Sequence, residues 1–278
     1  MISTNNSAVD GKHAEPVVQL PPKPFFNKYL TSFFEETAAI TLFGTRFFKE
    51  IFFPPYEFKE IMKQCYNVGV KSLGLIGITG FIMGLVLTIQ SRPTLSEFGA
   101  ESWLPAMVSV SVIREIGPVI TALICAGKVG SGMGAELASM KVTEQIDAME
   151  VSAINPFKYL VVSRILATTL MVPLLVIFAD AIALVGSFAG VNIKGDVSFM
   201  LYQSQVFDTL TFGDLIPATI KTIFFGYIIG LVACTQGYNS DKGTEGVGES
   251  ANTSVVIASL LIFIIDMIAV QVTDIFFS

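Results

Sequence analysis

Charged residues are scarce in this sequence. Only 14% of its 278 residues are Asp, Glu, Lys or Arg, whereas about a quarter of the residues of a soluble protein are charged. The net charge is −6 and Lys and Arg form no cluster, so a nucleic acid is not favoured as a partner. With 52% hydrophobic residues, the composition indicates an integral membrane protein.

Histidine and cysteine are also scarce. The three cysteines, Cys65, Cys125 and Cys234, lie far apart in or beside apolar segments, which indicates neither a disulfide framework nor a metal site. The only histidine, His13, lies in a polar leader over residues 1–24 that we expect to be disordered. We therefore predict no metal site, no catalytic residue and no cofactor in this chain.

A nucleotide-binding loop is missing as well. Gly127-Lys128 is followed by Val129 and Gly130 and not by Ser or Thr, and the upstream glycine spacing of a Walker A motif is absent. The glycine-rich run over 130–134 follows no predicted strand, so helix packing explains it better than dinucleotide binding. The chain is not expected to hydrolyse ATP by itself.

Five apolar stretches are long enough to cross about 30 Å of hydrocarbon, which takes roughly 20 residues each. Lys and Arg concentrate before the first stretch and in the 127–164 region, whereas the two opposite loops contribute only Arg92 and Lys194. This distribution predicts a cytoplasmic N-terminus and an outward C-terminus. The predicted fold is an all-α membrane protein crossing at Val70–Gln90, Trp103–Ala126, Tyr159–Gly186, Phe212–Gln236 and Ser254–Phe277.

The segment before the first crossing alternates phenylalanines with charges from Phe25 to Phe53. It is too charged to span a bilayer and is typical of an amphipathic helix lying in the interface. Pro54-Pro55 end it, and a shorter helix follows to Tyr66. We therefore divide the chain into a leader (1–24), interfacial amphipathic helices (25–66) and a transmembrane domain (67–278).

Ionisable residues inside the crossings are costly and are usually functional. Arg114 and Glu115 are adjacent on a helix and point about 100° apart, so one neighbour cannot serve both. We expect one of the two to pair within the bundle, with Asp180, Asp266 or Lys221 as candidates, and the other to reach a cavity. A ligand that carries a phosphate would favour Arg114 at the cavity, with Glu115 as the structural partner and Lys221 as a candidate for it. Structural ion pairs and contact with a ligand both remain open for the full set: Arg114, Glu115, Asp180, Lys221 and Asp266.

Small residues at helical spacing predict where helices approach each other closely. Gly127, Gly130 and Gly134 fall on one face of the second crossing and its extension, and Gly226 and Gly230 form a GxxxG pair in the fourth. All five glycines are assigned to helix packing.

An acidic amphipathic helix is predicted at about 136–155, ended by Asn155-Pro156. Its carboxylates Glu144, Asp147 and Glu150 spread around the helix with no His beside them. A partner-facing or solvated surface is therefore favoured over a divalent-ion site.

The run GKVGSGMGAELASMKVTEQIDAMEVSAINP over 127–156, with Arg114-Glu115-x-Gly117-Pro118 upstream, closely resembles the MlaE-type permeases of phospholipid ABC transporters. A later glycine motif over 237–248 matches too, but Glu249-Ser250-Ala251-Asn252 replaces the family's usual basic residue and Ala-Thr-Thr. The resemblance implies a homodimer in the bacterial inner membrane that moves phospholipids between the inner and outer membranes.

The same resemblance implies partners and roles. ATP would be used by separate cytoplasmic ATPase subunits, which would meet the short cytoplasmic helix through Glu144, Asp147, Glu150 and Asn155. A lipid-binding MCE-domain protein on the periplasmic side and a small cytoplasmic accessory subunit are further expected partners. Arg114, Glu115, Lys221 and Asp266 would then line the lipid cavity.

The alternative is a secondary transporter or a membrane-embedded enzyme that uses Glu115, Asp180 and Asp266 as proton carriers. No membrane segment contains a His and no nucleophile–base pair or metal motif is present, which disfavours an enzyme. Five crossings without an internal repeat do not divide into two halves, which disfavours a secondary transporter.

Overall fold

The structure, a computed structural model, describes residues 25–54, 57–193, 195, 197–240 and 243–277. Every regular element among them is helical, which confirms the all-α prediction. The predicted leader, 1–24, lies outside the described residues. Helix α1 (Phe25–Ile51) begins in one compact part of the chain, Met1–Ala38, and ends in the other, Ala39–Ser278, so its packing is described from Ala39 onward.

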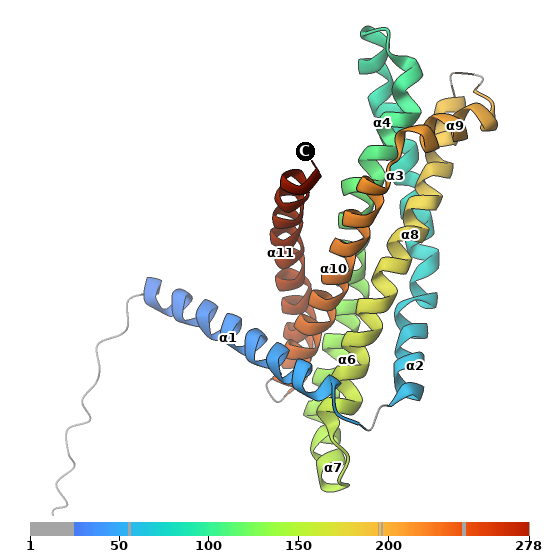
Figure 1. Cartoon of the computed structure of the whole chain (residues 1–278). Coiled ribbons are helices and arrows are strands. Elements are labelled where there is room, and N and C mark those ends of the chain that lie inside the picture. The colour runs from blue at the N-terminus through green and yellow to red at the C-terminus, as the bar shows by residue number, and fades with distance from the viewer. Residues whose placement is uncertain (1–24, 55–56, 194, 196, 241–242, 278) are drawn as a thin grey trace, which may run out of the picture. The chain divides into compact units, whose positions relative to one another are not determined.

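Five helical runs are long and apolar enough to cross a membrane, which confirms the five predicted crossings (Figure 1). Most of their ends extend beyond the predicted stretches because the helices continue past the apolar core into polar sequence. The runs are α2 (Phe58–Val68) with α3 (Val70–Glu97); η1 (Glu101–Trp103), α4 (Leu104–Ser111), η2 (Val112–Ile116), α5 (Gly117–Cys125), η3 (Ala126–Gly130) and α6 (Ser131–Val142); η4 (Phe157–Val162) with α8 (Ser163–Asn192); α10 (Phe212–Tyr238); and α11 (Thr244–Phe277).

Helix α2 differs from the prediction in the group to which it belongs. It was placed with the interfacial helices of 25–66, but only Gly69 separates it from α3, and its residues Glu60, Gln64 and Val68 are buried. It packs against α8. The buried face of α2 therefore joins the helices of the bundle.

The core of the described residues forms three main levels along the bundle, with a smaller fourth cluster around Val68 and Met133. The central level joins α3, α5, α8, α10 and α11 around Phe225 and Ile229. The level at the α4 end contains Val108 and Tyr202, and the level at the α7 end contains Phe157. Apolar side chains thus fill the bundle from one end to the other, which holds the helices at fixed spacing.

The tightest helix pair is α3 and α8. A Cβ on Gly84 would collide with the carbonyl group of Ala183, and one on Gly186 would collide with the carbonyl group of Phe81. Nearby, the Thr88 hydroxyl donates a buried hydrogen bond of 2.8 Å to another hydroxyl, on Ser187. Glycine allows this approach because backbones can touch where side chains are absent.

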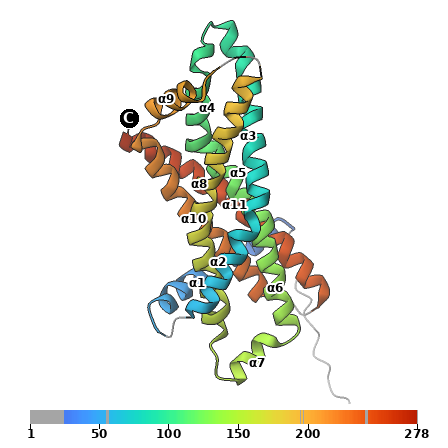
Figure 2. The same ribbon diagram turned by 90° about the vertical axis from the view of Figure 1, so that its right-hand side faces the viewer.

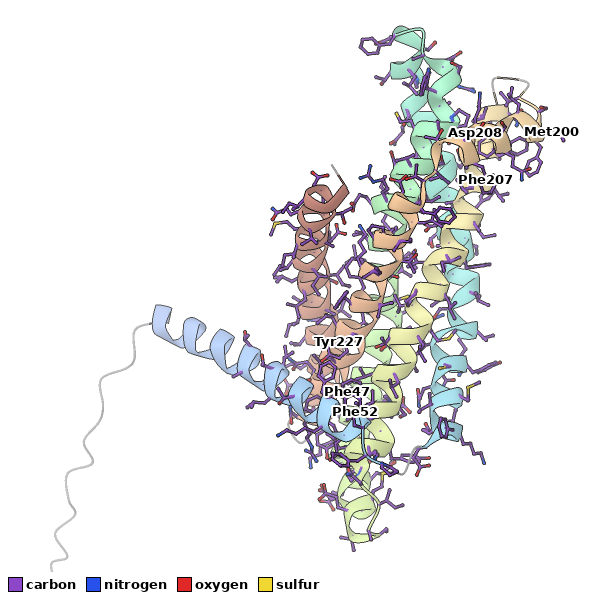
Figure 3. All side chains as sticks on the ribbon, in the orientation of Figure 1. Phe47, Phe52, Met200, Phe207, Asp208 and Tyr227 are labelled. Atoms are coloured by element: carbon purple, nitrogen blue, oxygen red, sulfur yellow. The ribbon has the colours of Figure 1, made fainter. Side chains whose placement is uncertain are left out.

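Two short helices lie at opposite ends of the bundle, α7 (Gln145–Val151) and α9 (Phe199–Thr209) (Figures 1 and 2). Helix α9 was not predicted. The Tyr202 hydroxyl holds it by donating to the Leu184 carbonyl at 3.0 Å. Met200 and Phe207, labelled on α9 in Figure 3, are exposed and give this helix an apolar surface.

The second half of α1 packs on the α7 end of the bundle. The ring of Phe47 lies 5.7 Å from that of Tyr227 on α10 (Figure 3), and the guanidinium of Arg46 sits 4.1 Å from the centre of the Phe157 ring. Phe43 and Phe47 are buried against protein, whereas Phe52 is exposed. Only part of the aromatic face is therefore free to meet lipid.

Candidate functional site

A buried lysine joins three membrane helices. The ammonium of Lys221 on α10 lies 2.7 Å from Oε2 of Glu115 in η2 and 2.8 Å from Oδ1 of Asp266 on α11. The side chain is only 5% exposed. The two carboxylates accept two of the three N–H donors of this ammonium and balance its charge in a low-dielectric setting. The structure thus gives Glu115 the partner that was considered for it and adds Asp266.

Arg114, the neighbour of Glu115, points elsewhere. Its Nε lies 3.4 Å from Oδ1 of Asp214, in the first turn of α10, and its side chain is 47% exposed. Asp214 was not among the predicted site residues. The sequence carries a signal for the start of this helix, because Thr211-x-x-Asp214 forms a capping box in which each side chain accepts from the other's backbone N–H. It carries no signal that Asp214 pairs with Arg114.

The backbone around Arg114 and Glu115 is a π-helical turn, η2. It is closed by the N–H of Gly117, which donates to the carbonyl of Val112, five residues earlier. Pro118 follows and has no N–H to continue the α-helical pattern. Such single π turns are frequent at functional sites. The turn positions the two charged side chains in different directions.

Asp180 on α8 packs against this turn. Its Oδ1 lies so close to Gly117 that a Cβ there would overlap it. This oxygen is buried and has no hydrogen-bond partner among the described residues. Asp180 therefore does not join the Lys221 ion cluster directly, unlike Asp266.

An apolar groove of about 430 Å³ runs between α10 and α11 and includes Lys221. It is lined by Ile216, Pro217, Ile220, Lys221, Phe224, Ile265, Ile268, Ala269, Val272 and Thr273. A smaller pocket of about 30 Å³ shares Lys221 and is lined by polar groups, among them Arg114, Glu115, Asp214 and Asp274. A hydrocarbon wall beside a charged pocket suits a molecule with an apolar tail and an ionic head. We call these two cavities together the groove site.

The predicted acidic helix at about 136–155 is two helices in the structure. Helix α6 ends at Val142, and α7 starts at Gln145 after Glu144, whose φ of 57° is left-handed. The turn changes the direction of the chain, and α7 lies at the end of the bundle beyond α6 (Figure 2). A continuous pattern of apolar residues hid this break, because periodicity does not register a single left-handed residue.

The predicted partner-facing residues are exposed at this end. Glu144 and Glu150 lie at the surface, and Asp147 accepts from the Lys141 ammonium at 2.9 Å. Asn155 accepts from the backbone N–H of Lys158 at 3.2 Å. Val151, which was not singled out from the sequence, is 90% exposed beside them. An exposed valine among carboxylates gives α7 a surface that is both apolar and acidic.

Arg164, at the start of α8, is a further charged residue that the site prediction omitted. It is 1% exposed, and its Nη2 lies 3.0 Å from Oε1 of Glu136 on α6. Its Nη1 donates to the Leu160 carbonyl at 3.0 Å, while its Nε has no partner among the described residues.

The glycines assigned to helix packing have different surroundings. A Cβ on Gly226 or Gly230 would overlap Thr168 on α8, and one on Gly134 would lie 2.7 Å from the Ser254 hydroxyl on α11. Gly130 has only an ordinary contact, and nothing described lies within 4 Å of a Cβ on Gly127. Gly127 and Gly130 belong to the π turn η3, whereas Gly134 lies on α6.

Within the described ranges, no group of three or more His, Cys, Asp or Glu is arranged to hold a metal ion.

Comparison with known proteins agrees with this geometry. Residues 61–272 match the family described as Permease MlaE. A probable ABC transporter permease protein of Rickettsia typhi is 37% identical over 237 residues, covering 85% of this chain and 92% of its own. The intermembrane phospholipid transport system permease protein of Haemophilus influenzae is 34% identical over 212 residues, covering 76% and 81%. A probable ABC transporter permease protein of Synechocystis is 34% identical over 206 residues, covering 74% and 78%.

Proposed function

The chain belongs to the MlaE permease family, and from that premise we propose that it is the transmembrane permease subunit of an ABC transporter that moves phospholipids between membranes. The groove site is the observation that carries the proposal. Its apolar length between α10 and α11 matches acyl chains, and its charged end matches a head group.

Arg114 is the residue we propose for the phosphate of the lipid. Its side chain is about half exposed and has one carboxylate near it at 3.4 Å, so guanidinium donors remain for a ligand. A guanidinium can engage phosphate through two parallel hydrogen bonds. Lys221 is already held between two carboxylates, and Glu115 and Asp266 would serve mainly to hold it.

ATP hydrolysis is proposed to occur in separate cytoplasmic ATPase subunits, which dock on α7. Its exposed Val151 would enter a hollow on the ATPase, and Glu144, Asp147, Glu150 and Asn155 would contact its rim. The chain itself needs no cofactor in this scheme.

The working unit is proposed to be a homodimer in the bacterial inner membrane. Helix α11 is largely exposed over apolar residues such as Phe263 and Met267, and a second copy would cover this face and close the groove site. The Lys and Arg distribution supports a cytoplasmic N-terminus and a periplasmic C-terminus. An MCE-domain lipid-binding protein outside and a small accessory subunit inside would complete the transporter.

Lipid that copurifies with the chain tests this function. We expect about tenfold less bound phospholipid for Arg114→Ala than for the unaltered protein, because a charge-assisted hydrogen bond contributes about 1.5–3 kcal/mol. Lys71→Ala, which removes an exposed basic side chain from α3, is the matched control and should retain lipid. Equal lipid in both variants would move the head-group site away from Arg114.

The alternative of a secondary transporter or membrane-embedded enzyme is not favoured, because the relatives are named as ABC transporter permeases.

A further inference from the structure

The charged end of the groove site is unbalanced. Arg114 and Lys221 bring two positive charges. Four carboxylates surround them: Glu115, Asp214 and Asp274 line the pocket, and Asp266 bonds to Lys221. Two positive and four negative groups leave a deficit of two positive charges. Carboxylates without matching cations are costly in a membrane segment, so a ligand that supplies positive charge would be stabilised here.

The existing pairs indicate where that charge is missing. Lys221 already serves two carboxylates at 2.7 and 2.8 Å, and Arg114 serves Asp214. Asp274, near the end of α11, is exposed, and no cation of the described residues lies within ion-pair distance of it. Glu115 is half exposed and bonds Lys221 through Oε2. The carboxylate oxygens that remain available to a positively charged ligand are therefore those of Asp274 and Glu115, beside the guanidinium of Arg114.

We propose that the groove site selects a zwitterionic phospholipid whose head group carries an ammonium group, over a phospholipid that is only anionic. This rests on the proposed function and specifies its cargo. The phosphate would meet Arg114, and the ammonium would meet Asp274 and Glu115. An anionic head group would add a negative charge to a pocket that already has too many, whereas the zwitterion adds none and places its cation among the carboxylates.

The test is the composition of the lipid bound by the purified full-length chain. The protein is equilibrated in detergent with equal amounts of phosphatidylethanolamine and phosphatidylglycerol that have identical acyl chains, and bound lipid is quantified by mass spectrometry. We expect bound phosphatidylethanolamine to exceed phosphatidylglycerol by about tenfold, which corresponds to about 1.4 kcal/mol.

Variants assign the preference to the pocket. Asp274→Asn should reduce the preference to about threefold, and Asp274→Lys should abolish or reverse it, because bound phosphatidylethanolamine falls relative to phosphatidylglycerol. Asp208→Asn is the matched control, because Asp208 is an exposed carboxylate on α9 that does not line the pocket (Figure 3). It should leave the preference at its original value.

The outcomes separate this inference from the proposed function. Lipid bound in the proportions of the mixture, or an unchanged preference in both Asp274 variants, would overturn the head-group assignment alone. Failure of the unaltered protein to bind either phospholipid would overturn the proposed function itself.

Discussion

Lys221 and Arg164 are both buried basic side chains in membrane helices, but their surroundings differ. Lys221 has two carboxylates within 2.8 Å and faces the groove site. Arg164 has one carboxylate partner, Glu136, which is 56% exposed, and one of its nitrogens has no partner among the described residues. Lys221 thus has two carboxylate partners for its single charge, whereas Arg164 has one, and that one is exposed.

This difference predicts how strongly each of the two cations stabilises the bundle. Removing Lys221 would leave two carboxylates facing each other in an apolar setting. Removing Arg164 would leave a single carboxylate that water can reach. The same chemical change should therefore have unequal effects at the two positions.

The largest effect is expected for Lys221→Met. It leaves Glu115 and Asp266 without their shared cation, which we expect to cost about 3–5 kcal/mol and to lower Tm by on the order of 10 °C. Thermal unfolding in detergent, followed by intrinsic fluorescence, measures the change. The exposed Lys71→Met provides the control, and a Tm equal to that of this control would mean that the ion cluster does not stabilise the bundle.

A smaller effect is expected for Glu115→Ala. Lys221 loses one charge-assisted hydrogen bond but keeps Asp266, so the cost should be about 2 kcal/mol. The Tm should fall about half as far as in Lys221→Met. Glu97→Ala, at an exposed carboxylate of α3, should leave Tm unchanged. A loss as large as that of Lys221→Met would mean that Asp266 alone cannot hold the lysine.

Arg164→Met should be milder still, at about 1 kcal/mol. The change removes a buried nitrogen that lacks a partner, and Glu136 becomes hydrated at the surface. Comparing its Tm with that of Lys221→Met tests the contrast directly. If Arg164→Met unfolds the protein more readily than Lys221→Met, our ranking of the two cations is wrong.

The smallest effect on stability is expected for Glu144→Lys combined with Asp147→Lys. The Lys141–Asp147 pair is partly exposed, and such pairs contribute about 0–1 kcal/mol. Association with the ATPase, measured by copurification, should nevertheless drop strongly because contacts across an interface depend on charge sign. Glu97→Lys with Asp208→Lys, at the opposite end, is the control. Full ATPase association in the α7 variant would exclude α7 as the docking site.

The sequence predicted the crossings and named Lys221 among the candidate partners of Glu115, because both follow from the cost of exposing polar groups to lipid. Each crossing needs about 20 apolar residues, and each buried charge needs a partner. Asp266 was considered only among several candidates, since one sequence does not reveal which helices are neighbours. The structure selects it by bringing α11 alongside α10.

Three features required tertiary information. Helix α9 was missed because the search was for stretches long enough to cross a membrane, and its eleven residues are too few. Arg164 was not recognised as buried because an arginine at the end of a long apolar stretch can usually extend its side chain to water. The π turns η2, η3 and η4 depend on the packing of neighbouring helices, and periodicity analysis assumes that they are absent.

The π turns have a practical consequence for mapping this protein. Each holds one residue more than an α-helical turn, which rotates all later positions by about 100°. A single helical wheel drawn over Glu101–Val142 therefore assigns many positions to the wrong side. Scanning by spin label, cysteine accessibility or crosslinking should use separate wheels before η2, between η2 and η3, and after η3.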